Sequence, residues 1–118
     1  MDNVSIGVIG CGKMARDLAH RCLRSGRCRI AAVYDPDPQA LFDAAAELLA
    51  EPVRELEELC ARPDVDAVIV GSPPGAHLEG VLAAAGARKP VYCEKPLGIS
   101  VAECDKMIAA CRRAGVPL

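Results

Sequence analysis

Short apolar runs alternate along the chain with longer segments in which apolar residues recur every three or four positions. The runs are typical of strands buried on both faces, and the longer segments are typical of helices with one buried side. The predicted strands are residues 4–9, 29–34, 51–53, 65–70 and 90–93, and the predicted helices are residues 13–25, 37–50, 55–62, 77–86 and 100–114. Residues 116–118 are typical of the start of a sixth strand that is cut off.

Local signals support the boundaries of the predicted helices. Asp37 followed by Pro38 is a typical N-cap and first turn, and Ser100 with Glu103 forms the pattern of a capping box. Glycine follows the first and last predicted helices, where it commonly ends a helix. These end signals therefore support the helices and strands predicted from the pattern of apolar residues.

Strict alternation of strands and helices with short connections predicts one α/β domain covering residues 1–118. We expect a doubly wound, Rossmann-type, mostly parallel sheet of about five strands with helices on both faces, its sixth strand truncated. No linker or low-complexity tract divides the chain.

Composition excludes several classes of protein. In 118 residues, 52% are hydrophobic, which is incompatible with disorder, and the net charge of −2 gives no basic surface for nucleic acid. No apolar run approaches the ~20 residues of a membrane span, and the N-terminal residues lack the basic region of a signal peptide. The seven cysteines contain no metal-ligand spacing and favour a reduced, cytoplasmic protein without metal.

The segment GCGKMA at residues 10–15 matches the dinucleotide-binding pattern G-x-G-x-x-G/A. In that pattern Gly10 permits a tight turn, Gly12 lets a pyrophosphate approach the backbone, and Ala15 allows close packing of helix on strand. The following helix N-terminus offers N–H groups to phosphate. The alternative is a glycine-rich turn with a purely steric role.

Asp35 ends the second predicted strand, where a carboxylate can bind the ribose hydroxyls of NAD and would repel the 2′-phosphate of NADP. No Arg or Lys stands between residues 36 and 46, so the sequence favours NAD over NADP. The alternative role for Asp35 is that of a turn or capping residue, and both roles can hold together.

Other chemically interesting residues follow the fourth and fifth predicted strands, at the same edge of the sheet. Lys95 could polarise a substrate oxygen, or it could be an exposed lysine paired with Glu94. His77 begins a helix near this edge and could contact the cofactor or the substrate. A histidine at the start of a helix is just as often structural. Cys11 lies within the glycine loop, where lining the loop is favoured over nucleophilic chemistry because no partner base is identifiable.

Three segments together resemble the N-terminal domain of the Gfo/Idh/MocA oxidoreductase family. They are VSIGVIGCGKMA near the start, YDPDP at residues 34–38 and DAVIVGSPPGAHLEGVLAAAGARKPVYCEKPLGIS at residues 66–100. The most specific element is the EKP tripeptide at residues 94–96. The resemblance covers essentially the whole chain.

The resemblance implies an NAD(P)-binding domain and hydride transfer between nicotinamide and a sugar-like or cyclic alcohol or ketone. It implies that Lys95 contacts substrate and cofactor and assists proton transfer as the catalytic residue. The complete set of candidate cofactor-binding residues is Gly10, Cys11, Gly12, Lys13, Met14, Asp35, Ser72, Pro73, His77, Glu94 and Lys95.

Members of this family continue into a second domain that supplies most of the substrate pocket, and we expect that domain to be absent from residues 1–118. We therefore expect cofactor binding without turnover by this chain alone, since hydride and proton transfer need a positioned substrate and acid/base. The alternatives are a stand-alone module that senses NAD, or a subunit completed by a separate chain. An unpaired sheet edge would favour a homodimer.

Overall fold

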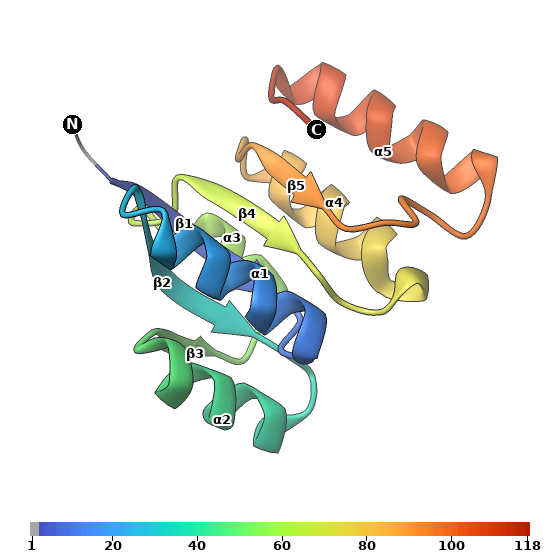
Figure 1. Cartoon of the computed structure of the whole chain (residues 1–118). Helices are drawn as coiled ribbons and strands as arrows, with labels where there is room; N and C mark the ends of the chain where they lie inside the picture. The colour runs from blue at the N-terminus through green and yellow to red at the C-terminus, as the bar shows by residue number, and fades with distance from the viewer. Residues whose placement is uncertain (1–2) are drawn as a thin grey trace.

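The computed structural model describes residues 3–118 and contains a single five-stranded sheet (Figure 1). Its strands are β1 (Val4–Ile9), β2 (Cys28–Tyr34), β3 (Glu51–Val53), β4 (Ala67–Val70) and β5 (Val91–Cys93). Every neighbouring pair is parallel, and the spatial order is β3-β2-β1-β4-β5. The predicted doubly wound α/β fold is confirmed, with strand boundaries within two residues of those expected.

Helices cover both faces of the sheet (Figure 1). They are α1 (Lys13–Arg24), α2 (Pro38–Leu48), α3 (Leu56–Ala61), α4 (His77–Gly86) and α5 (Val101–Ala114), with a short 3₁₀ turn, η1 (Pro74–Ala76), ahead of α4. The helices α1 and α2 pack on one face, α3 and α4 pack on the other, and α5 packs against α4. The sequence did not predict η1.

Each face of the sheet has its own apolar core. Val8, Ile30 and Leu41 are buried between the sheet and the α1–α2 layer. Leu59 and Met107 are fully buried on the opposite side, within the layer formed by α3, α4 and α5. The near-continuous apolar strands of the sequence are explained by this double coverage.

The strand order reverses between β1 and β4. From β1 the chain moves outward through β2 to β3, then crosses back to β4 on the other side of β1. In open α/β sheets, ligands bind outside the carboxyl ends of the strands at such a point. The fold therefore places the loops after β1 and β4 side by side at the expected binding position.

The helix caps follow the predicted residues with one difference. The Asp37 side chain accepts a hydrogen bond from the Gln39 N–H, and the Ser100 side chain accepts one from the Glu103 N–H. The Glu103 carboxylate, however, accepts from the Ile99 N–H at 3.4 Å, one residue before the N-cap. The capping box of α5 is therefore shifted at its second bond.

Residues 116–118 do not form the expected sixth strand. A single backbone hydrogen bond joins them to the sheet, donated by the Val91 N–H to the Pro117 carbonyl at 3.0 Å. One bond does not make a ladder, so these residues lie beside β5 in irregular backbone. Among residues 3–118, no helix is both long and apolar enough to span a membrane.

Candidate functional site

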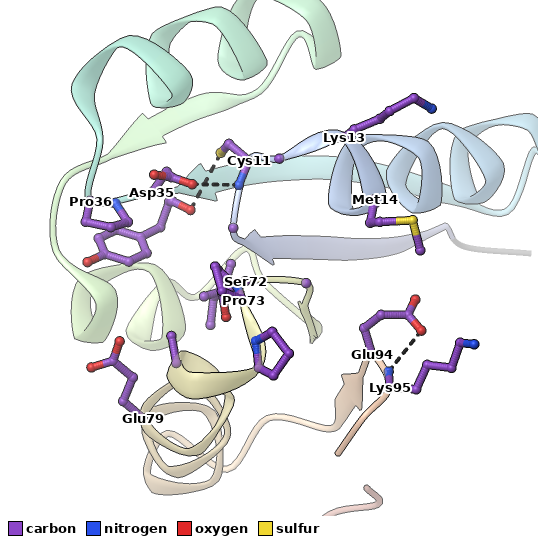
Figure 2. A pocket seen from close by; sticks show the side chains of 17 residues that line it. Cys11, Lys13, Met14, Asp35, Pro36, Ser72, Pro73, Glu79, Glu94 and Lys95 are labelled. Carbon is purple, nitrogen blue, oxygen red and sulfur yellow. Dashed lines mark hydrogen bonds between the residues drawn. The ribbon is translucent and has the colours of Figure 1, made fainter. Parts of the chain in front are cut away.

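A cavity of about 520 Å³ opens at the carboxyl ends of β1, β2, β4 and β5 (Figure 2). Ten of the eleven predicted cofactor-binding residues line it, all except His77. They are Gly10, Cys11, Gly12, Lys13, Met14, Asp35, Ser72, Pro73, Glu94 and Lys95. Residues far apart in the sequence thus meet in one hollow, because parallel strands end at the same edge of the sheet.

Two glycines are needed where the glycine loop and the start of α1 pack against the loop after β4. Gly10 has φ +96°, and a Cβ atom there would lie 2.5 Å from the backbone nitrogen of Ser72. A Cβ atom on Gly71 would lie 2.8 Å from the Cβ of Ala15, so α1 approaches the loop after β4 very closely. Gly10 and Gly71 are therefore required by the fold, whether or not a ligand binds.

Gly12 differs from both because nothing in residues 3–118 requires glycine at this position. Its φ of −73° suits any residue, and a Cβ atom built on it would meet no atom within 4 Å. The free space belongs to the cavity that Gly12 lines. A glycine that the fold does not need, beside an open cavity, favours close approach of a ligand over the purely steric interpretation.

The N-terminus of α1 presents its first backbone N–H groups beside Gly12. The helix begins without a side-chain cap, and no acidic residue stands in its first turn. By contrast, α2 and α5 are capped by Asp37 and Ser100. The Lys13 side chain forms an ion pair with Asp17 at 2.8 Å, so Lys13 contributes to the loop mainly through its backbone. Uncapped N–H groups and the positive end of the helix dipole suit a phosphate.

Asp35 holds the glycine loop in place through its carboxylate. One carboxylate oxygen accepts a hydrogen bond from the Cys11 N–H at 2.8 Å, and the other accepts from the Asp37 N–H at 2.9 Å. Each carboxylate oxygen has a further lone pair, so the group can still accept hydrogen bonds from hydroxyls in the cavity. The turn role and the ribose-binding role expected for Asp35 are therefore compatible.

The Cys11 thiol is unsuited to nucleophilic chemistry. Its side chain is buried, with Sγ 3.6 Å from the carbonyl oxygen of Tyr34. Burial, with a smaller contribution from the Asp35 charge, raises the pKa of the thiol to about 12. The reactive thiolate is therefore disfavoured at neutral pH, which leaves Cys11 as a lining residue.

Ser72 supplies a polar atom without a partner. Its Oγ is buried, and among residues 3–118 no group lies within hydrogen-bonding reach of it. Ser72 also lines the cavity, next to Pro73. Buried polar groups are usually hydrogen-bonded, and the Ser72 hydroxyl, like that of Ser5, is an exception within the described residues.

Glu94 and Lys95 enter the cavity from the end of β5 (Figure 2). The Glu94 N–H donates to the Val70 carbonyl at 2.9 Å and extends the pairing of β5 with β4. The Glu94 carboxylate accepts from the Lys95 backbone N–H at 3.0 Å, and within the described residues no ion pair holds the Lys95 ammonium. Figure 2 shows the Lys95 side chain extending away from Glu94. The Lys95–Pro96 peptide bond is cis.

His77 lies behind the cavity, not in its wall. Its side chain is 1% exposed, and both ring nitrogens face backbone carbonyls of neighbouring loops. The structure thus brings ten predicted residues together and leaves His77 without exposed surface there.

The cavity also contains residues that the sequence analysis missed. They are Ile9, Tyr34, Pro36, Gly71, Pro74, Ala76 and Glu79. Two of these residues have ionisable side chains, Tyr34 at the end of β2 and Glu79 in the first turn of α4 (Figure 2). In the sequence, the only sign that Glu79 lies near the site was its position two residues after His77. The turn η1, which the sequence did not predict, sets where the first turn of α4 lies relative to the cavity.

Comparison with known proteins agrees with this geometry. A family model described as "Oxidoreductase family, NAD-binding Rossmann fold" matches residues 4–118. The inositol 2-dehydrogenase of Pseudomonas fluorescens is 40% identical over 111 residues, which cover 92% of this chain and 33% of that protein. The 2,7-anhydro-N-acetylneuraminate hydratase of Escherichia coli is 36% identical over 113 residues, covering 96% of this chain and 30% of that protein.

A solved structure has the same arrangement. The WlbA dehydrogenase from Bordetella pertussis, crystallised with NADH and UDP-GlcNAcA, superposes with a TM-score of 0.90 at 28% sequence identity. The match covers 98% of this chain and 34% of that one. The chain therefore spans about a third of the length of the relatives it matches.

Proposed function

This chain belongs to the Gfo/Idh/MocA oxidoreductase family with its NAD-binding Rossmann fold, and we propose that it is the cofactor-binding part of an NAD(H)-dependent oxidoreductase. The proposed substrate is a sugar-like or cyclic alcohol or ketone. Support for this class comes from relatives whose names state inositol or a sugar derivative, and from a structural neighbour crystallised with a sugar nucleotide.

The observation that carries the proposal is the unfilled space at Gly12. The fold makes no demand for glycine there, yet a side chain would enter the cavity beside the uncapped start of α1. The pyrophosphate of a dinucleotide fits this place, held by the backbone N–H groups of α1.

Asp35 favours NAD over NADP in this proposal. Its carboxylate is fixed by two backbone N–H groups and retains lone pairs for the two ribose hydroxyls. The same negative charge would repel a 2′-phosphate. In the residues lining the cavity, the two cationic side chains are Lys13, which pairs with Asp17, and Lys95, which follows β5.

When bound, the nicotinamide supplies the carbon that accepts or donates the hydride. The chain's own residues hold the cofactor and present one polar group for the reaction. Lys95 donates a hydrogen bond from its ammonium to the substrate oxygen and assists proton transfer at that atom. Because its ammonium has no ion-pair partner among the described residues, it is available for this contact.

The chain alone binds the cofactor without turnover. Hydride transfer needs the substrate carbon held against the nicotinamide, and the cavity offers one wall of a site. The match to about a third of each relative supports the view that the rest of the substrate pocket comes from additional sequence or from a second chain. A stand-alone NAD-sensing module remains the second candidate, and it predicts the same binding.

Calorimetric titration with NADH tests the proposal. The wild-type chain should give a saturable heat, and Gly12→Val should weaken binding at least about a hundredfold by filling the phosphate-approach space. Gly86→Val is the matched control, because a Cβ atom on Gly86 also meets nothing within 4 Å but lies at the end of α4, outside the cavity. No saturable heat with the wild type, or equal binding by both variants, would refute the proposal.

Two further predictions complete the proposal. A cytoplasmic location follows from the reduced thiols and the NAD(H) pool that such an enzyme uses. A homodimer along the outer edge of β5 requires release of the Pro117 carbonyl from the Val91 N–H. A strictly monomeric sizing profile at high protein concentration would contradict the dimer.

A further inference from the structure

His77 is the most deeply buried ionisable side chain near the cavity, and the proposed chemistry does not use it. It is 1% exposed and does not line the cavity, so it reaches neither cofactor nor substrate directly. Burying an imidazole is costly unless its nitrogens find partners. The groups that its two ring nitrogens face therefore indicate its role.

All three hydrogen-bonding contacts of the His77 ring within the described residues are with backbone carbonyl oxygens of the loops after β4 and β5. Nε2 lies 2.8 Å from the carbonyl oxygen of Ser72, in the loop after β4. Nδ1 lies 2.9 Å from the carbonyl of Pro96 and 3.1 Å from that of Leu97, in the loop after β5. Because carbonyl oxygens only accept hydrogen bonds, a proton on Nε2 ties His77 to the loop after β4 and a proton on Nδ1 ties it to the loop after β5. The neutral ring carries one of these two protons, and the doubly protonated ring carries both.

The loop after β5 has few other ties at this point. The Glu94 N–H pairs with β4, and the Ile99 N–H is held by Glu103. Between these two positions, the hydrogen-bonding contacts of the backbone with other parts of the described chain are the His77 ring and a long approach of the Cys93 thiol to the Leu97 carbonyl at 3.9 Å. Leu97 also packs against the apolar core, and Gly98 lies close to Cys104 at the start of α5. Pro96 and Leu97 directly follow Lys95, so His77 anchors the end of the turn that carries Lys95.

We propose that His77 is a positioning residue that fixes the Lys95-bearing turn against the cofactor loop after β4. The inference rests on the proposed function insofar as Lys95 acts on cofactor or substrate. The imidazole acts through backbone carbonyls, and Lys95 makes the contact. This assignment differs from the cofactor contact expected from the sequence, and it explains why the histidine is buried at the first residue of α4.

Two amide variants separate the contacts. The amide nitrogen of asparagine can occupy the place of Nδ1, whereas that of glutamine reaches the place of Nε2. His77→Asn should keep a donor toward Pro96 and Leu97, and His77→Gln should keep one only toward Ser72. Both variants lose the ring, so a role limited to core packing predicts that both behave alike.

Hydrogen exchange provides a readout that needs no cofactor. His77→Gln should accelerate exchange of the amides of residues 97–99 about tenfold relative to His77→Asn, while the amides of β1 and β4 keep their wild-type protection. Protection of the sheet shows that both variants fold. Equal exchange at residues 97–99 in the two variants would overturn the proposal.

A double-mutant cycle with Lys95→Ala tests whether His77 acts through Lys95. His77→Gln should weaken NADH binding about fivefold in the wild-type background, and less than about twofold once Lys95 is alanine. A fivefold loss that persists without Lys95 would refute the positioning role. If the wild-type chain binds no NADH, the proposed function fails, and the exchange experiment still decides whether His77 anchors the turn.

Discussion

Removing the Asp35 carboxylate should both destabilise the chain and change its cofactor preference. Asp35→Ala deprives two backbone donors of their acceptor, the Cys11 N–H at 2.8 Å and the Asp37 N–H at 2.9 Å. The Cys11 amide lies in partly buried surroundings, whereas the Asp37 amide is exposed and can bond to water instead. The two losses are therefore unequal.

A hydrogen bond to a charged group is worth about 1.5–3 kcal/mol, and an exposed one falls below that range. Together the two bonds give a loss of about 3 kcal/mol, against a total stability of about 6–18 kcal/mol for a domain of this length. The variant should stay folded. With a urea slope of about 2 kcal/mol per molar, the unfolding midpoint should fall by about 1.5 M.

Urea unfolding followed by far-ultraviolet circular dichroism measures this shift, since the chain contains no tryptophan. Asp43→Ala is the control, because within the described part of the chain that exposed carboxylate accepts a hydrogen bond only from the Gln39 side chain, at 2.9 Å. Its midpoint should move by less than about 0.3 M. Equal shifts in the two variants would show that the carboxylate of Asp35 does not hold the glycine loop.

The same variant tests the ribose assignment. Loss of the carboxylate should weaken NADH binding and remove the repulsion of a 2′-phosphate, raising the affinity ratio of NADPH to NADH about tenfold. Asp43→Ala should leave the ratio unchanged. If Asp35→Ala binds NADH as tightly as the wild type, the carboxylate contributes only to the turn.

Two further predictions concern stability. Burial raises the pKa of Cys11 to about 12 and those of Cys60 and Cys93 to about 11, from an ordinary value of 9.0. As the pH rises, the unfolded chain therefore releases these protons before the folded chain does. The contribution of the buried thiols to stability is complete below about pH 9 and should fall steadily as the pH rises toward 11–12. Urea midpoints measured at a series of pH values would show this fall, and a flat profile would contradict the burial of the thiols. Leu49 ends α2 with φ +53° and is 90% exposed, so Leu49→Gly should stabilise the chain by about 0.5–1 kcal/mol, and a lower melting temperature would contradict the strain at this position.

Much of the fold was readable from local pattern. Apolar runs without alternation indicated strands covered on both faces, and helical spacing with caps such as Asp37 and Ser100 indicated the helices between them. Parallel order followed from the alternation, because a crossover helix returns the chain to the same end of the sheet. Residues after successive strands could thus be assigned to one edge of the sheet from the sequence alone.

The features that the sequence did not predict correctly have a common cause. The turn η1, the missing sixth strand and the place of Glu79 in the cavity depend on contacts between distant segments. Residues 116–118 have a strand-like composition, but they make one bond with β5 rather than a ladder. Local propensity does not report whether a partner strand is available over enough residues.

By itself, the sequence determined the alternation, the glycine loop and the identity of the groups at the sheet edge, because these depend on residue type and spacing along the chain. Only the tertiary structure separated Gly10, which the fold requires, from Gly12, which it does not, because the distinction depends on what lies across the loop. It also placed His77 behind the cavity with its ring between two loops. Which side chain faces a ligand and which supports it from behind depends on packing between segments far apart in the chain.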